Sequence, residues 1–145
     1  MTAFRQLLKD PRVVELLSTL GTPYDWAVGD PNDTWPPTKC DCSGFTQMAL
    51  VYLKMLKSTE VDRNAMSLAN ICDAVTDEPR LGDLAFYARP VSHVMLVLNK
   101  DWVIGATGGT SATNSDNPEA CVQLRRLRYR KDLTVVGRLK VGLAP

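Results

Sequence analysis

The chain has 145 residues, the usual size of one domain, and 45% of them are hydrophobic and 23% charged. This composition predicts a single folded domain over residues 1–145 and excludes a disordered chain. Lys and Arg number 17 and Asp and Glu 16, so the formal net charge is +1, which argues against a nucleic-acid-binding protein. The one basic run, RRLRYRK at 125–131, is interpreted as the solvated side of a strand and turn.

The N-terminal segment does not have the pattern of a secretion signal. Charged residues interrupt its apolar positions, and Pro11 divides them. No run of 18 apolar residues occurs in the sequence, so no transmembrane helix is expected. We therefore expect a protein that is made in the cytoplasm without a signal peptide and does not insert into a membrane.

The predicted elements of the first half are helices. Apolar residues recur at helical spacing over 3–9 and 11–20. Residues 22–41 contain four prolines and are predicted to form a long irregular loop, a kind of loop that is often functional in compact domains. Further helical patterns cover 42–57 and 63–75.

The second half changes to the period-two pattern of strands. Strand-like runs separated by turn residues lie at 83–88, 93–99, 102–107, 121–127 and 134–142. Residues 108–118 form a loop by composition. Helices followed by an antiparallel meander predict an α+β fold, in which N-terminal helices pack on a central antiparallel sheet of about five strands.

The chain contains four cysteines, at positions 40, 42, 72 and 121. Reduced thiols are expected in a cytoplasmic protein, and Cys40 and Cys42 are too close in sequence for an unstrained disulfide. Cys72 lies in a helical pattern and Cys121 starts a strand, so both are interpreted as small buried hydrophobes. A zinc site would need a spacing such as C-x2-C, which is missing, and no metal is expected.

Cys42 lies where a helix is predicted to begin. The unpaired N–H groups and partial positive charge of a helix N-terminus stabilise a thiolate, so the pKa of this thiol is expected to be lowered. Asp41 and Ser43 can pair with free backbone donors, and Gly44 permits close approach of another group. From its position alone, Cys42 is either a nucleophile or a structural thiol.

His93 is the only histidine in the chain. Alternation puts Met95 and Val97 on its face of a strand whose two faces are both apolar, so the strand is predicted to be central and buried. Such a histidine is either a hydrogen-bonded core residue or a base held beside a thiol. Spacing alone does not decide between these two roles.

Five motifs occur in a characteristic order along the chain. They are GTPYDWAVGDP at 21–31, DCSGF at 41–45, RLGDLAFY at 80–87, SHVMLVLN at 92–99 and WVIGAT at 102–107. Together they resemble the NlpC-type cysteine peptidases, bacterial cell-wall hydrolases with a compact papain-like fold. The resemblance implies that the protein acts on peptidoglycan stem peptides, needs no cofactor and is a monomer.

The resemblance also assigns roles to individual residues. It makes Cys42 the nucleophile and His93 its base. Tyr24 matches a tyrosine near the nucleophile that helps to form the oxyanion region. Asp41 and Ser43 match positions that help to hold the free amino end of the stem peptide.

One departure from the family pattern concerns the residue that orients the imidazole. The family has a third polar residue, often histidine, on the strand after the base, and Gly105 stands at the matching position. We expect the space beside Gly105 to hold a water or a polar group, with Thr107, a backbone carbonyl, Ser111 and Asn114 as candidates.

These observations predict a cysteine peptidase or amidase that cleaves amide bonds in the stem peptide. A phage endolysin or an exported effector fits the sequence better than a secreted housekeeping autolysin. Two alternatives stay open, a non-catalytic member of the same fold that binds a peptide or serves as a structural module, and an acyltransferase on the same Cys–His scaffold.

Overall fold

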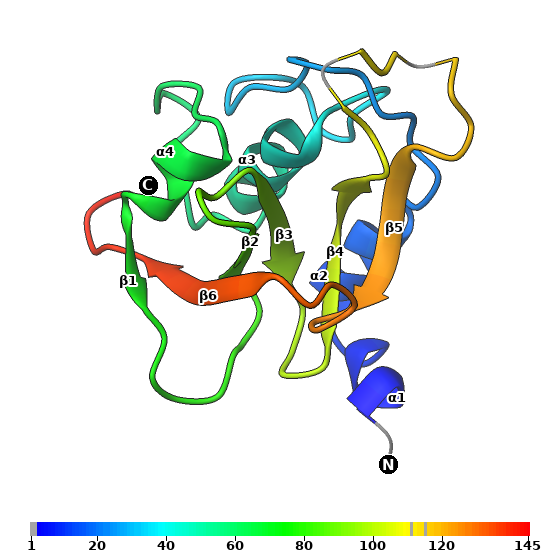
Figure 1. The fold of residues 1–145 in the computed structure, drawn as a ribbon. Helices are drawn as coiled ribbons and strands as arrows, with labels where there is room; N and C mark the ends of the chain where they lie inside the picture. Colours follow the sequence, from blue (N-terminus) through cyan, green and yellow to red (C-terminus); the bar gives the residue numbers. More distant parts are fainter. Residues whose placement is uncertain (1–2, 111, 115) are drawn as a thin grey trace.

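The computed structural model describes residues 3–110, 112–114 and 116–145. A six-stranded antiparallel sheet in the order β1-β6-β2-β3-β4-β5 forms its centre (Figure 1). The strands are β1 (Cys72–Ala74), β2 (Leu84–Tyr87), β3 (His93–Val97), β4 (Trp102–Thr107), β5 (Cys121–Arg126) and β6 (Leu133–Leu139). The predicted α+β class is confirmed, and the sheet has one strand more than expected.

Four helices complete the described elements: α1 (Ala3–Leu7), α2 (Pro11–Leu17), α3 (Cys42–Tyr52) and α4 (Ala65–Ala69). Helix α3 is the longest and packs against β3 and β4. Residues 42–50 of α3 are all buried, so this helix is an internal element and lacks a solvent-facing side over most of its length. No helix among the described residues is long and apolar enough to cross a membrane.

The extra strand, β1, replaces part of a predicted helix. The apolar spacing over 63–75 predicted a helix that continued through Cys72, but α4 ends at Ala69 and Cys72 pairs with Leu139 of β6. A three-residue strand has too few residues to show a period of its own, and its pairing partner lies far along the chain. Cys72 is therefore a half-buried strand residue, and the prediction of a buried helical thiol was wrong.

The sheet has an apolar cluster on each face, as predicted for the central strand β3. Val94 and Leu96 belong to the main core, which includes the inner side of α3. Met95 and Val97 belong to a smaller cluster on the other face, against which Tyr129 packs. This second cluster brings the turn after β5 close to the start of β3, where His93 lies.

Candidate active site

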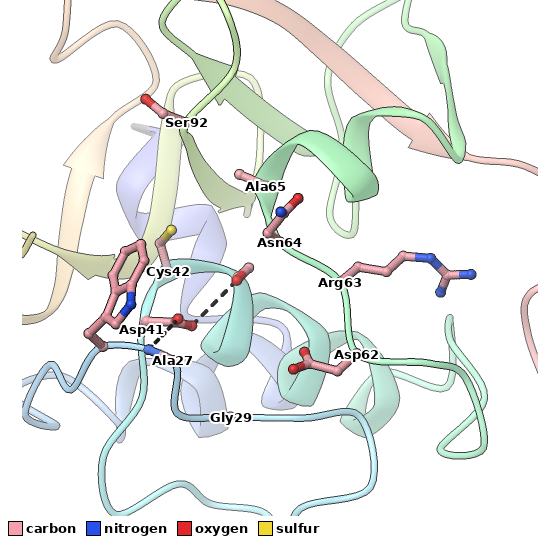
Figure 2. A pocket seen from close by; sticks show the side chains of 11 residues that line it. Ala27, Gly29, Asp41, Cys42, Asp62, Arg63, Asn64, Ala65 and Ser92 are labelled. Atoms are coloured by element: carbon pink, nitrogen blue, oxygen red, sulfur yellow. Dashed lines mark hydrogen bonds between the residues drawn. The ribbon is translucent and has the colours of Figure 1, made fainter. Parts of the chain in front are cut away.

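The start of α3 is tied to the preceding loop by Asp41. Its carboxylate caps the helix, because Oδ1 accepts from the backbone N–H of Gly44 at 2.7 Å. Oδ2 accepts from the N–H of Ala27 at 3.0 Å (Figure 2). A Cβ at Gly44 would lie 2.2 Å from the carbonyl oxygen of Val28. Because Gly44 has no side chain, the backbone of Val28 approaches it closely, as predicted from the sequence. Loop 22–41 therefore passes directly over the start of α3.

Cys42 is the first residue of α3, and only 8% of it is exposed. Burial raises the pKa of the Cys42 thiol to about 11, although the N–H groups of Val94 and Ser43 oppose the shift. The lowered pKa expected from the helix N-terminus does not result, because loss of hydration disfavours the thiolate more than these donors stabilise it. Because the Val94 N–H is among the groups that act on this thiol, Cys42 lies near the start of β3, the strand that begins with His93.

His93 is the first residue of β3 and lies opposite Tyr87 of β2. Its Nε2 is 2.9 Å from the hydroxyl of Tyr129. Burial and the nearby charge of Arg130 lower the pKa of His93 to about 4, while Asp132 acts in the opposite direction. At neutral pH both the imidazole and the Cys42 thiol are therefore uncharged.

The space beside Gly105 is not open to a water. A Cβ at Gly105 would lie 2.7 Å from Sδ of Met95, so an apolar side chain occupies the position, contrary to expectation. Thr107 does belong to the surroundings of the imidazole, because its hydroxyl lies 3.2 Å from that of Tyr129. Asn114 is exposed and accepts from a backbone N–H within its own loop, and Ser111 lies outside the described residues.

Tyr129 was not anticipated from the sequence. It lies in the basic run that was interpreted as the solvated side of a strand and turn, and five of the seven residues in that run are basic. Its place beside His93 depends on the pairing of β5 with β4 and on the turn that follows, which carries its ring onto the second cluster. No local pattern in the sequence indicates such a contact.

Tyr24 is only 3% exposed and its backbone pairs with Cys40. Burial raises the pKa of its hydroxyl, and the charges of Cys42 and Asp41 act in the same direction, which puts this hydroxyl in the neighbourhood of the thiol. Trp35 of the same loop stacks on Tyr52 near the other end of α3, with ring centroids 5.0 Å apart.

A pocket of about 210 Å³ lies over the helix start (Figure 2). Loop 22–41, the first residues of α3, the segment 62–65 and the turn before β3 each form part of its wall. The lining residues are Trp26, Ala27, Gly29, Asp41, Cys42, Ser43, Asp62, Arg63, Asn64, Ala65 and Ser92. Cys42 points its sulfur toward the side of the pocket on which Ser92 lies.

The wall formed by residues 62–65 is held in place by Gln47, a fully buried residue of α3. Its amide nitrogen donates to Oδ1 of Asp62 at 2.9 Å and to the carbonyl of Arg63 at 2.9 Å. Its amide oxygen accepts from the N–H of Arg63 at 2.8 Å. No local sequence pattern indicates this wall, because its shape depends on contacts with a helix some 15 residues earlier.

The described residues contain no group of three or more His, Cys, Asp or Glu side chains placed to hold a metal ion. All four cysteines are free. The groups that line the pocket include the Cys42 thiol, the carboxylates of Asp41 and Asp62, and hydroxyl groups, whereas His93 is not among its lining residues.

A helix that starts with a cysteine and packs on an antiparallel sheet with a histidine at the start of a central strand is the arrangement of a papain-like domain. The model of the NlpC/P60 family matches residues 21–131, and the chain belongs to this family. No curated protein matches the chain.

Solved structures of this family share the fold. NlpC2 from Trichomonas vaginalis is 21% identical, with a TM-score of 0.63 over 86% of this chain and 44% of that chain. The peptidoglycan hydrolase RipB from Mycobacterium tuberculosis is 23% identical, with a TM-score of 0.60 over 97% and 69% of the two chains. RipD from M. tuberculosis, a non-catalytic NlpC/p60 domain protein, is 21% identical, with a TM-score of 0.57 over 90% and 94%. The chain spans less than half the length of the Trichomonas proteins.

Proposed function

We propose that the protein is a cysteine peptidase or amidase that hydrolyses amide bonds in peptidoglycan stem peptides. One observation carries the proposal: the Cys42 sulfur lines a pocket at the end of β3 where the only histidine of the chain stands. The likeness to RipB, a peptidoglycan hydrolase, supports the choice of substrate class.

The reaction starts with the Cys42 thiol and the His93 imidazole both uncharged. As Cys42 Sγ attacks the amide carbonyl carbon, His93 takes the thiol proton, so that the thiolate forms only while the new C–S bond forms. The carbonyl oxygen becomes an oxyanion, which the Cys42 N–H and the Tyr24 hydroxyl stabilise. The C–N bond then breaks, and His93 returns the proton to the departing amine. Water hydrolyses the thioester with His93 again as base, which releases the acid and restores the thiol.

The pocket also suits the amino end of a peptide. Asp41 and Asp62 place two carboxylates in its wall, and Ser43 adds a hydroxyl. Asp41 already accepts bonds from two backbone N–H groups, so its main role is to build the wall. Asp62 accepts one bond, from Gln47, and supplies the more accessible negative charge for an ammonium group.

A second candidate is a non-catalytic domain that binds peptidoglycan. The uncharged Cys42–His93 pair and the glycine at position 105 favour it, and RipD shows that the family fold exists in a non-catalytic protein. Under this proposal the same pocket holds the stem peptide without cleaving it.

The test compares the wild type with Cys42→Ala on purified peptidoglycan, with the products identified by mass spectrometry. Cys121→Ala is the matched control, because it removes a half-buried thiol outside the pocket. The hydrolase predicts new amino ends with the wild type and Cys121→Ala and none with Cys42→Ala. Retention on peptidoglycan without any new amino end would favour the binding domain. Cleavage by Cys42→Ala at the wild-type rate would rule out the proposed nucleophile.

The biological setting we propose is that of a phage endolysin or an exported effector. Lysis of intact bacteria by purified protein added from outside, compared with lysis after delivery to the periplasm, distinguishes the two.

A further inference from the structure

Side chains from β3, β4 and the turn after β5 form a hydrogen-bonded row at the start of β3. Nε2 of His93 in β3 lies 2.9 Å from the Tyr129 hydroxyl, and that hydroxyl lies 3.2 Å from Oγ1 of Thr107 in β4. His93 and Thr107 are both among the buried polar residues. Position 105, where the family pattern has a polar residue, has no side chain, and Met95 fills the space beside it.

Tyr129 is held firmly enough to fix the position of another group. Its ring meets that of Tyr87 edge-on, with centroids 5.4 Å apart. The Tyr87 hydroxyl donates at 2.7 Å to the carbonyl of Leu127, which anchors the turn that carries Tyr129 to the sheet. Arg130, the residue that follows Tyr129, is held by an ion pair with Asp132.

The hydrogens in this row can be arranged in two ways. A phenol has one hydrogen and can also accept, so it either donates to Nε2 or accepts from it. If it donates, the imidazole proton is on Nδ1, and neither ring nitrogen is free to take a proton from the thiol. If it accepts, the Tyr129 O–H is directed to Thr107 and Nδ1 keeps a free lone pair. Only the second arrangement supplies a base.

We propose that Tyr129 is the positioning residue of the site, which accepts from Nε2–H of His93, donates to Thr107 and thereby keeps Nδ1 unprotonated for the Cys42 thiol. This inference rests on the proposed hydrolase function. Tyr129 takes over the orienting role that Gly105 lacks a side chain to perform. Because its hydroxyl is neutral, it selects the tautomer without strongly stabilising the imidazolium, in agreement with a pair that is uncharged at rest.

The experiment uses the single histidine as its own probe. In the full-length protein labelled with 15N-histidine, the two ring nitrogens of His93 are the only imidazole signals, and their chemical shifts show which one carries the proton. We expect Nε2 protonated at neutral pH in the wild type. Tyr129→Phe, which keeps the ring but removes the hydroxyl, is expected to give an averaged or Nδ1–H signal, and Thr107→Val a smaller change in the same direction.

Tyr52→Phe is the matched control, because it removes the hydroxyl of a half-buried tyrosine near the far end of α3. It is expected to leave the signals unchanged. On a stem peptide, Tyr129→Phe is expected to lower kcat by roughly tenfold or more with little change in KM, as part of the ~10²–10⁴-fold that a positioned general base contributes. A wild-type proton on Nδ1, or signals that Tyr129→Phe leaves unchanged, would overturn the inference.

The tautomer is measured without substrate, so the two hypotheses fail separately. An Nε2–H signal that depends on Tyr129, in a protein that cleaves no peptidoglycan, would refute the hydrolase and leave the positioning contact established. Cleavage by a wild type whose proton lies on Nδ1 would support the hydrolase and refute the role of Tyr129.

Discussion

Met95 occupies the space in which a side chain at position 105 would have to lie. A Cβ built on Gly105 comes within 2.7 Å of the Met95 sulfur and 3.5 Å of its Cα. The two positions lie on neighbouring strands, and Met95 is fully buried in the second cluster. The absence of a side chain at position 105 therefore leaves no empty space, because Met95 packs against the glycine.

The first prediction concerns this packing. Gly105→Ala is expected to destabilise the protein by about 1–3 kcal/mol, because an added methyl group in a filled core forces its neighbours to move. Gly105→His is expected to cost more. The double variant Met95→Ala/Gly105→Ala is expected to lose less free energy of unfolding than the two single variants lose together. Urea denaturation of the wild type and the four variants measures these values. A cost below about 0.5 kcal/mol for Gly105→Ala would show that Met95 moves aside freely.

The second prediction concerns the reactivity of Cys42. With a pKa of about 11, the thiol is expected to react slowly with iodoacetamide at pH 6 and about tenfold faster for each unit of pH up to pH 9. Mass spectrometry of the digested protein separates labelling of Cys42 from labelling of the half-buried Cys121. Equal rates at pH 6 and pH 9 would reveal a thiolate already present, as the position at a helix N-terminus alone suggested.

The third prediction follows from the lowered pKa of His93, which burial causes. Between its unfolded value of 6.5 and its folded value of about 4, the unfolded chain binds a proton that the folded protein excludes. Stability is therefore fully present above pH 6.5 and falls as the pH decreases toward 4. The ring lies against Tyr87 and Tyr129, the charges of Arg130 and Asp132 act on it, and the Cys42 thiol lies near the start of the same strand.

The free energy of unfolding is expected to fall by about 3 kcal/mol between pH 6.5 and pH 4. The free energy of unfolding at pH 7 and pH 4.5, measured with urea, checks it. His93→Asn should lack most of this dependence, because the carboxylates with lowered pKa values lose their contribution only at lower pH. The same slope in the variant would show that His93 is not the titrating group.

The parts of the fold that local sequence patterns encode could be predicted, and the parts that depend on distant pairing could not. The run His93–Val97 alternates between two apolar faces, so its burial at the centre of the sheet was evident. Cys72 belongs to a segment with helical spacing, and only its pairing with β6 makes it a strand. Tyr129 reaches His93 across 36 residues of sequence, and no property of its own neighbours indicates that contact.

The candidate site divides in the same way. Motif order was enough to single out Cys42, His93 and Tyr24 as candidates. His93 begins β3, Cys42 lies near the start of that strand, and the charge of Cys42 acts on the Tyr24 hydroxyl. The charge state of Cys42 could not be predicted from its helix position, because it depends on how completely loop 22–41 and β3 cover the sulfur. Burial is a property of the whole fold, and here it outweighs the local effect of the helix terminus.

The last prediction compares two helix caps. Asp10 caps α2 and accepts from the N–H of Arg12, whereas Asp41 caps α3 and also accepts from Ala27 in the loop that covers the pocket. Ala27 has a φ of +60°, a strained left-handed conformation for a residue other than glycine, and its bond to Asp41 helps to hold it there. Removing the Asp41 carboxylate therefore removes both the cap of α3 and the hydrogen bond that holds Ala27 in its strained conformation.

We expect Asp41→Ala to cost about 2 kcal/mol of stability and Asp10→Ala about 1 kcal/mol, with urea denaturation as the measurement. Asp41→Asn retains one oxygen that can cap the helix and should fall between Asp41→Ala and the wild type. Hydrolysis of a stem peptide should be lost in Asp41→Ala and unchanged in Asp10→Ala, because only the first residue shapes the wall beside Cys42. If both alanine variants lose equal stability and keep full activity, the bond to Ala27 has no part in holding the loop over the nucleophile.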